Sequence, residues 1–325
     1  MLLGVDGGNT KCVALVAARD GRIAGAARGG PSDIYGADGA EAALREIERA
    51  TTSALAAAGA SADDVQAAVF SLAGADWPED HDFLRSELSR RLALGRLEVV
   101  NDALGALRAG TSDGIGVAVV CGTGGAVGAR SPEGKAWHSS FWTPKTGGWA
   151  IGSRALEAVY RAELGMGPET RLTDAALEVF EALSVEELLH SFTRHDGRRR
   201  PFDSSLFAPA VLGEAARGER VAHQIVLEQG RLLGETAAAA ARIVGLEGRP
   251  CPLVLLGGVL RGDGADLLRA EITARLPDAT EAETRFEPAA GALLAAFDAA
   301  GVEPDEDRLR ETLPGPEFFA SSTAR

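Results

Sequence analysis

A short stretch near the amino terminus combines residue types that suit phosphate chemistry. It reads Asp6-Gly7-Gly8-Asn9-Thr10-Lys11 and lies between two apolar runs. Asparagine and glycine tolerate the positive φ angles of a tight hairpin, and bare glycine backbone lets N–H groups form a nest for an anion. Thr10 adds a hydroxyl donor, and Asp6 is placed to hold a Mg²⁺ ion that bridges phosphates. An ordinary hairpin with an incidental acid would look the same, so this stretch alone does not decide.

A second stretch far along the chain repeats this pattern of an apolar strand, a glycine-rich turn and another apolar strand. The apolar run 116–121 enters Gly122-Thr123-Gly124-Gly125, and another short apolar run follows. Neither stretch has the spacing of a Walker A loop, and neither opens a helix as a dinucleotide-binding glycine motif does. Two strand–glycine–strand hairpins predict two similar halves that face one nucleotide.

Polar or glycine positions also follow the expected buried strands of the first half. They are Asp6, Gly74, Asp76, Asn101 and Asp102. Ligands of open α/β sheets gather at the carboxyl ends of the strands, so we expect these five positions to meet at one edge.

Composition limits the class of protein. With 46% hydrophobic and 25% charged residues in 325, the chain is typical of a globular protein with room for two domains. The net charge of −14 argues against a nucleic acid or an anionic membrane as partner. No apolar run is long enough to span a membrane, and no targeting segment precedes the first strand, so we expect a cytoplasmic protein. The separated Cys12, Cys121 and Cys251 predict reduced core residues rather than a metal site.

The order of elements predicts an α/β fold of two domains with mixed sheets. Residues 1–112 form three strands in a meander followed by alternating helices and strands, and 113–287 repeat this order with a helical insertion at about 168–245. In the second half we expect a third strand at 135–139, a helix at 154–164 and a last strand at 282–286. We expect a helix at 288–301 to join the first domain and residues 302–325 to form a peripheral tail. We expect the basic run Arg194–Arg200 to be an exposed loop.

With these strings placed, the chain resembles the sugar kinase–actin–heat-shock-chaperone ATPase superfamily. Within it, the resemblance is to the N-acetylglucosamine kinase branch, which also contains the BadF-type ATPases. The matching strings, which extend over nearly the whole chain, are Asp6–Lys11, Leu72–Asp76, Asn101–Ala103, Gly122–Gly124, Gly257–Val259 and Glu287–Ala292.

The resemblance implies ribonuclease-H-like domains with five-stranded sheets, ATP and Mg²⁺ in the cleft, and a sugar bound mainly by the first domain. It implies that Asp102 is the general base, although Asp102 would equally suit an N-cap of the following helix. The implied ATP-binding residues are Gly8, Asn9, Thr10, Lys11, Gly122, Thr123, Gly124, Gly257 and Gly258. The implied substrate-binding residues are Ser32, Asp33, Gly74, Asp76, Asn101, Asp102, Gly148 and Trp149.

The chain departs from the family pattern in its sugar-contacting loop. Where the family has an acidic pair, the chain has either Pro144-Lys145 or a deletion, and Asp33 stands where the family has an amide. The sequence therefore predicts a kinase of an amino sugar, such as N-acetylglucosamine, glucosamine or a derivative, with the preferred sugar open. The alternative is a non-catalytic nucleotide or sugar sensor, which would not need Asp6 and Asp102. The sequence also leaves the oligomeric state open, with a homodimer as one candidate.

Overall fold

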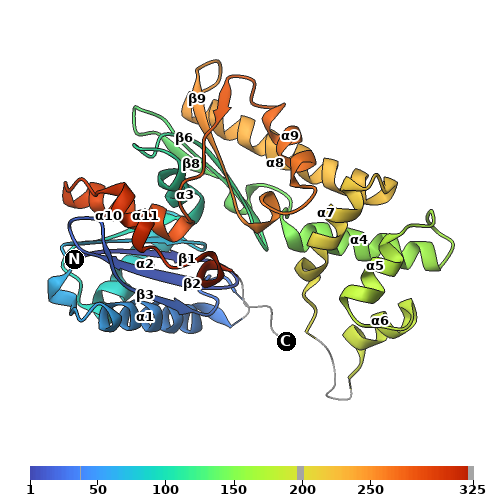
Figure 1. The fold of residues 1–325 in the computed structure, drawn as a ribbon, viewed down its shortest axis with the longest axis horizontal. Helices are drawn as coiled ribbons and strands as arrows, with labels where there is room; N and C mark the ends of the chain where they lie inside the picture. The colour runs from blue at the N-terminus through green and yellow to red at the C-terminus, as the bar shows by residue number, and fades with distance from the viewer. Residues whose placement is uncertain (37, 196–200, 321–325) are drawn as a thin grey trace.

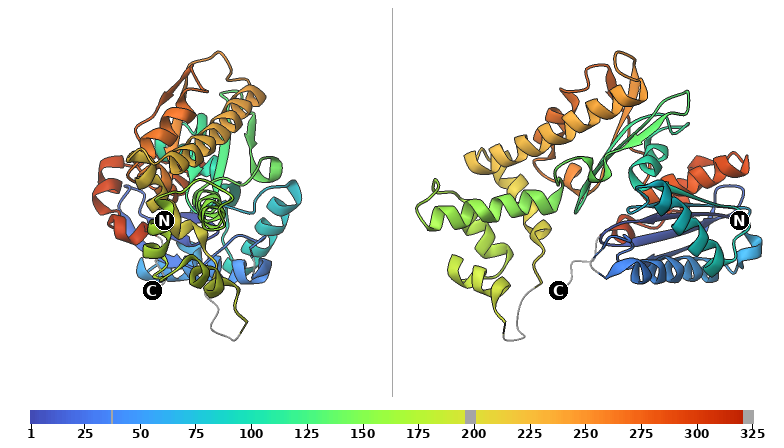
Figure 2. Two further views of the ribbon diagram at one scale, coloured as in Figure 1. Left: turned by 90° about the vertical axis from the view of Figure 1, so that its right-hand side faces the viewer. Right: turned by 180° about the vertical axis from the view of Figure 1, so that it is seen from behind.

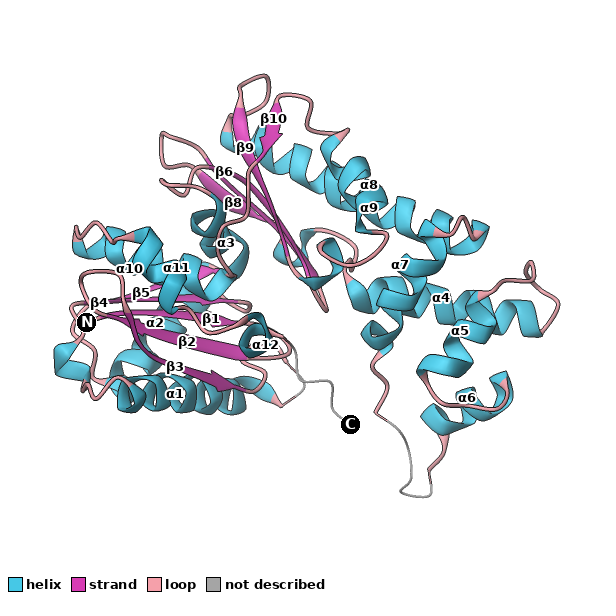
Figure 3. Ribbon diagram, viewed as in Figure 1, coloured by secondary structure: helices cyan, strands magenta, loops and turns pink. Residues whose placement is uncertain are grey.

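The fold consists of two α/β domains, each built on a mixed five-stranded sheet (Figure 1). The computed structural model describes residues 1–36, 38–195 and 201–320. Figure 3 shows the two sheets in magenta, with helices on their faces. This architecture confirms the fold class expected from the sequence.

The first sheet has the order β3-β2-β1-β4-β5. Its strands are β1 (Leu2–Gly7), β2 (Cys12–Ala17), β3 (Ile23–Gly29), β4 (Ala67–Leu72) and β5 (Leu97–Asn101). β1 pairs antiparallel with β2 and parallel with β4, and β4 pairs parallel with β5. Because the register aligns Gly7 with Leu72 and Leu72 with Asn101, the residues that follow these strands meet at one edge.

The second sheet has the equivalent order, β10-β9-β6-β7-β8. Its strands are β6 (Gly116–Cys121), β7 (Gly125–Arg130), β8 (Ala136–His138), β9 (Cys251–Leu256) and β10 (Ala279–Glu281). The expected last strand at 282–286 is wrong: the side-chain hydroxyl of Thr284, and not a backbone N–H, donates to the Leu255 carbonyl on β9. The Ala282 N–H still donates to the Leu253 carbonyl at 2.8 Å, so the ladder ends at Ala282 and β10 precedes the expected strand.

Matching helices cover the two sheets. In the first domain, α1 (Gly39–Ala57) packs on β3 and β2, and α2 (Pro78–Leu92) packs on β5. In the second domain, α8 (Arg220–Val244) packs on β7 and β6, and α9 (Ala265–Thr273) packs on α8. The insertion expected at 168–245 therefore ends too late, because α8 is the counterpart of α1 and belongs to the domain itself.

Two further helices are exchanged between the domains. The helix α3 (Asp102–Gly110) follows β5 of the first sheet and packs on β6 and β7 of the second. The helix α10 (Pro288–Ala300) follows β10 of the second sheet and covers β1 and β4 of the first, as expected from the sequence. The two helices also pack on each other, where a Cβ on Gly291 would lie 2.9 Å from the Ala109 nitrogen.

The insertion proper forms a helical lobe that extends away from the first domain (Figure 2). It contains α4 (Gly148–Glu163), α5 (Leu172–Val179), α6 (Val185–Thr193) and α7 (Ala208–Ala216). The basic run Arg194–Arg200 lies after α6, and its residues 196–200 lie outside the described residues.

The carboxyl-terminal tail is not peripheral as the sequence suggested. It forms α11 (Glu306–Thr312) and α12 (Pro316–Phe319). Leu309 is fully buried and Phe319 is 8% exposed, both in the core that α10 forms with the first sheet. Burial of these two apolar side chains holds the tail against the domain.

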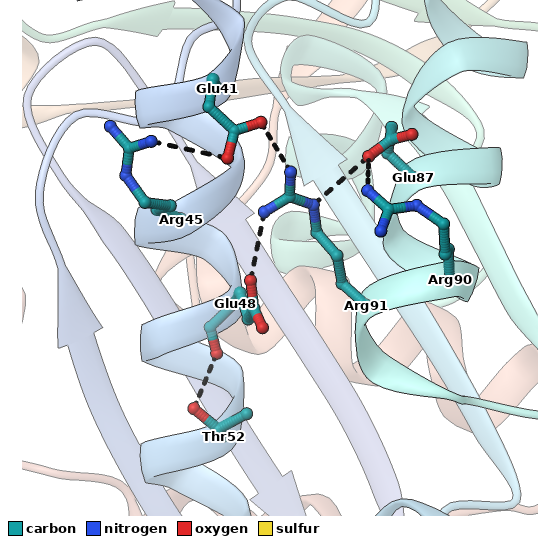
Figure 4. A network of polar contacts seen from close by, with 7 residues as sticks. All are labelled: Glu41, Arg45, Glu48, Thr52, Glu87, Arg90 and Arg91. Carbon is teal, nitrogen blue, oxygen red and sulfur yellow. Dashed lines mark hydrogen bonds and ion pairs between the residues drawn. The ribbon is translucent and has the colours of Figure 1, made fainter.

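An ion-pair network ties α1 to α2 on the outer face of the first domain (Figure 4). The Arg91 side chain is 12% exposed and contacts Glu41 at 2.6 Å, Glu48 at 3.2 Å and Glu87 at 3.3 Å. Because one guanidinium serves three carboxylates of two helices, it fixes their relative orientation.

Cys12, Cys121 and Cys251 are buried and unpaired, as expected. Among the described residues, no helix has both the length and the apolar character to cross a membrane.

Gly4 provides a direct test of how closely α10 packs on β1. A Cβ at Gly4 would lie 2.2 Å from the Leu293 backbone nitrogen, so Gly4→Ala must displace α10. Overpacking of this kind costs about 1–3 kcal/mol, which chemical denaturation will measure as a lower free energy of unfolding. Gly95→Ala is the control, because no described atom lies within 4 Å of the Cβ position there. Equal stability of the two variants would contradict the close packing of α10.

Candidate active site

A cavity of about 440 Å³ lies between the two domains and contains both glycine hairpins. All the predicted ATP-binding residues line it, together with the predicted metal ligand Asp6 and the predicted base Asp102. The structure thus brings together residues that are more than two hundred positions apart in the sequence.

The two hairpins meet across the cavity. The Thr10 and Thr123 hydroxyl oxygens lie 2.9 Å apart. Each hairpin is closed by its own backbone bond, from Gly8 N–H to the Lys11 carbonyl and from Gly122 N–H to the Gly124 carbonyl, both at 2.9 Å. Backbone amides and hydroxyls of both domains therefore converge on one space, as a polyphosphate would require.

The amino terminus of α4 supports the second hairpin. Gly148 N–H donates to the Gly122 carbonyl and Trp149 N–H to the Thr123 carbonyl, both at 2.8 Å. These bonds satisfy free N–H groups of the first helical turn, so α4 begins at Gly148 and not at Arg154 as expected. Gly148 and Trp149, predicted to bind substrate, lie behind the phosphate hairpin in this structure. The Lys145 ammonium is 5.2 Å from the centre of the Trp149 ring.

Glycine is required at Gly257 by both conformation and space. Its φ is +103°, and a Cβ there would lie 2.3 Å from the Cys121 carbonyl oxygen. This close approach of the chain after β9 to the end of β6 lets Gly257 and Gly258 line the cavity wall. Arg261 and Glu287, 2.5 Å apart, line the cavity beside them.

Asp6 and Asp102 are both partly buried carboxylates with raised pKa values. Burial raises the pKa of Asp6 to about 6, and the neighbouring Lys11 opposes the shift. Burial and the nearby Asp6 charge raise the pKa of Asp102 to about 7, while the Ala103 N–H opposes that rise. Two carboxylates that repel each other in a partly desolvated cleft favour a bound cation.

These residues fit a Mg²⁺ ion. Mg²⁺ in nucleotide sites typically takes one or two carboxylates and completes its shell with phosphate oxygens and water. Asp6, with Asp102 nearby, meets that requirement, and among the described residues no larger cluster of His, Cys, Asp and Glu could hold a metal by itself.

The predicted sugar side contains a network of hydrogen bonds around Asp102. Asn101 caps α3: its Oδ1 accepts from Ala103 N–H at 3.0 Å, and Asp102 Oδ1 accepts from the same N–H at 2.9 Å. Asn101 Nδ2 donates to Asp76 Oδ1 at 2.9 Å. The N-cap role considered for Asp102 thus belongs chiefly to Asn101, and Asp102 lines the cavity.

Asp33 and Gly74 lie beside this network, but Ser32 does not. A Cβ on Gly74, whose φ is +104°, would lie 2.8 Å from Asp33 Oδ1. Burial raises the pKa of Asp33, and the nearby Asp76 and Asp80 charges add to the rise. Ser32 is 1% exposed, and its backbone N–H donates to the Gly8 carbonyl at 3.0 Å. Ser32 therefore holds the first glycine hairpin by a backbone hydrogen bond instead of facing this network.

Sequence reasoning missed the segment after β8, where Ser140 donates from Oγ to Asp76 Oδ1 at 2.6 Å. Its neighbour Phe141 contacts Tyr35 edge-on at 5.1 Å and stacks on Trp77 at 6.5 Å between ring centres. Aromatic residues make up only 5% of the chain, so their concentration at 137–142 was a usable signal.

The tail was missed as well. Pro316, Phe319 and Ala320 line the same cavity as Asp6 and the hairpins. Nothing in the composition of this segment links it to a site near the amino terminus.

The two mixed five-stranded sheets and the cavity between them are the fold of the actin-like ATPase class. The profile of the BadF/BadG/BcrA/BcrD ATPase family matches residues 3–296. The chain belongs to this family, which confirms the predicted resemblance.

Curated relatives and solved structures agree with this class. N-acetyl-D-glucosamine kinase of Dictyostelium discoideum is 27% identical over 314 residues, which cover 91% of this chain and 98% of the relative. N-acetylmuramic acid/N-acetylglucosamine kinase of Clostridium acetobutylicum is 26% identical over 263 residues, 80% of this chain and 85% of the relative. A Chromobacterium violaceum structure, described provisionally as an N-acetylglucosamine kinase, has a TM-score of 0.68 and 25% identity, with coverage of 91% and 98%.

The tail offers a test of how the cavity is built. Phe319→Ala removes an apolar wall, and we expect about a tenfold weaker affinity for a non-hydrolysable ATP analogue, since one aromatic side chain contributes roughly 1–3 kcal/mol when buried. Isothermal titration calorimetry will measure the Kd, and denaturation will show whether the fold is intact. Glu317→Ala, an exposed change in the same helix, is the control. An unchanged Kd for Phe319→Ala would show that the tail is no part of the nucleotide site.

Proposed function

We propose that this protein is an ATP-dependent kinase that phosphorylates a hydroxyl group of an amino sugar, with Asp102 as general base. The observation that carries the proposal is the position of Asp102. It lines the cavity that holds both phosphate hairpins, and it is joined through Asn101 to the carboxylate cluster of the first domain. A group at that junction faces the phosphate on one side and the acceptor on the other.

Phosphoryl transfer depends on positioning and charge neutralisation more than on covalent chemistry. The backbone amides of Gly8–Thr10 and Gly122–Gly124, with the Thr10 and Thr123 hydroxyls, would orient the phosphates. Lys11 adds positive charge beside Asp6. A Mg²⁺ ion held by Asp6 would neutralise charge on the phosphate oxygens.

Asp102 would accept the proton of the attacking sugar hydroxyl. Its pKa of about 7 makes it a stronger base than an ordinary carboxylate, and the Ala103 N–H fixes the position of Oδ1. The N-cap geometry and the base role are compatible because Asn101 shares that N–H.

The first domain would hold the sugar with Asp33, Gly74, Asp76 and Asn101. Carboxylates accept hydrogen bonds only, so Asp33 and Asp76 suit sugar hydroxyls or a protonated amine. The second domain supplies no acid in the region of Pro144-Lys145, and Lys145 lies over Trp149. The preferred acceptor is therefore best sought among both free and N-acylated amino sugars.

Curated relatives support the amino-sugar class. Besides the two N-acetylglucosamine kinases, glucosamine kinase of Vibrio cholerae is 27% identical over 231 residues.

A non-catalytic sensor is not favoured, since binding alone gives no reason for a buried base next to a metal-binding carboxylate. ADP release in the presence of ATP and Mg²⁺, measured with glucosamine, N-acetylglucosamine and N-acetylmuramic acid, tests the proposal. No turnover with any amino sugar would overturn it.

Asp102→Asn tests the base. We expect phosphorylation to fall by ~10²–10⁴-fold, because the amide keeps the shape but accepts no proton at neutral pH. The affinity for an ATP analogue should stay within about threefold, since the hairpins are untouched. A variant that kept more than about a tenth of the wild-type turnover would exclude Asp102 as the base.

The raised pKa of Asp102 predicts a characteristic pH dependence. The base acts only when deprotonated, so kcat/KM for the sugar should rise with pH through about 7 and level off above it. At saturating ATP, kcat/KM for the sugar reports ionisations of the enzyme–ATP complex that has not yet bound sugar. Initial rates at saturating ATP between about pH 5 and 9 will show it. An acid limb below about pH 5, the range of ordinary carboxylates, would contradict the buried environment.

A further inference from the structure

The segment after β8 links the second domain to the first. Ser139 anchors it to the second sheet: its backbone N–H donates to the Val127 carbonyl at 2.8 Å, and its Oγ accepts from Val127 N–H at 3.0 Å. Over the next three residues the chain makes a 3₁₀ turn that contacts the first domain. Residues of the second domain thereby reach the predicted sugar side.

Ser140 makes the polar part of this link. Its Oγ donates to Asp76 Oδ1 at 2.6 Å and lies 2.6 Å from His138 Nδ1. Because the hydroxyl has one hydrogen, His138 Nδ1 is the donor in the second contact. His138 thus fixes the hydroxyl in the orientation that points its hydrogen at Asp76.

The link continues to the base through two more residues. Asp76 Oδ1 also accepts from Asn101 Nδ2, and Asn101 Oδ1 accepts from the Ala103 N–H that Asp102 shares. Two donors on one oxygen lock the rotation of the Asp76 carboxylate. Ser140 of the second domain is therefore connected to the proposed base of the first domain by an unbroken series of hydrogen bonds.

The backbone of Ser140, the residue that makes the hydrogen bond to Asp76, is strained. Its φ is +32°, a value that non-glycine residues adopt at some cost. Packing of Phe141 on Tyr35 and Trp77 holds the turn in this conformation, and Trp142 adds a contact with Trp77 at 6.4 Å. A strained residue held by contacts on both sides indicates a geometry that the site requires.

We propose that Ser140 is a positioning residue. Through its hydrogen bond to Asp76, the second domain orients the carboxylate proposed to bind the sugar. Through the further hydrogen bond from Asn101 to Asp76, it also orients the amino terminus of α3, which carries Asp102. This inference rests on the proposed function for its catalytic consequence. Its structural part, the link from Ser140 to α3, stands on the hydrogen bonds alone.

Ser140→Ala tests the proposal kinetically. Loss of one hydrogen bond to a charged group should lower kcat/KM for the sugar by about 10–100-fold. The KM for ATP should stay within about twofold, because the hairpins do not contact Ser140. Ser140→Gly removes the same hydroxyl and relieves the backbone strain, so an equal loss in both variants assigns the effect to the hydroxyl.

Thr143→Ala is the matched control, since it removes a hydroxyl from the same segment. It should leave all kinetic constants within about twofold of wild type. If Ser140→Ala changed kcat/KM for the sugar by less than about threefold, or changed the ATP and sugar constants equally, Ser140 would have no positioning role.

Amide hydrogen exchange gives a readout that needs no sugar. In Ser140→Ala, exchange in peptides that contain Asn101–Ala103 should be about tenfold faster than in wild type or Thr143→Ala, because the cap of α3 is loosened. Unchanged exchange would overturn the proposed link. A wild-type protein inactive on every amino sugar would instead refute the proposed function, and the exchange result would still decide the role of Ser140.

Discussion

The exchange of α3 and α10 between the domains is the constraint on which the rest of the structure depends. Each helix follows a strand of one sheet and packs on the other sheet, so neither domain can complete its core alone. Glycines make this possible: Gly4 lies under α10, and Gly128 lies under α3, where a Cβ would be 2.8 Å from the Ala103 carbonyl carbon. The same close packing places the first turn of α3, with Asp102, at the mouth of the cavity. The position of Asp102 is thus a consequence of how the two cores are shared.

The electrostatics of the site follow from that placement. Asp6 and Asp102 come from parallel elements of one sheet edge, and the domains remove both from full contact with water. Burial raises the pKa values of both groups; the Glu287 charge adds to the rise at Asp6, and the Asp6 charge adds to the rise at Asp102. Asp33 and Asp76 extend the acidic surface toward the sugar side. The two glycine hairpins line the same cavity as Asp6 and Asp102, so amide and hydroxyl groups lie beside the carboxylates.

The two domains contribute unequally although their sheets share one topology. Each provides a glycine hairpin from its first two strands, and these hairpins meet at Thr10 and Thr123. Asp6, Asp33, Asp76 and Asp102 belong to the first domain, whereas the helical lobe between the third strand and the long helix α8 belongs to the second. The segment at 139–142 connects the two domains, because it brings a hydroxyl and two aromatic rings of the second domain into contact with the acidic side of the first.

The sequence by itself determined the local structural features of this protein. Glycine hairpins between apolar strands, polar residues at strand ends and the order of elements depend on neighbours in the chain, so they predicted both sheets and the helix at 288–301. The family resemblance added the two hairpins, Asp6, Asp102 and Gly257-Gly258 as site residues, and all of these line the cavity between the domains. The boundaries of α4 and β10 were wrong because their ends are set by partners distant in sequence. The hairpin carbonyls accept from Gly148 and Trp149 at the start of α4, and the Leu255 carbonyl accepts from the Thr284 hydroxyl after the last ladder bond, which Ala282 donates. Only the tertiary structure decided that α8 belongs to the second domain, that Phe319 of the tail lines the cavity between the domains, and that Ser140 reaches Asp76. These depend on contacts between segments whose spacing in the sequence carries no periodic or compositional trace, and they form only when the shared core brings the segments together.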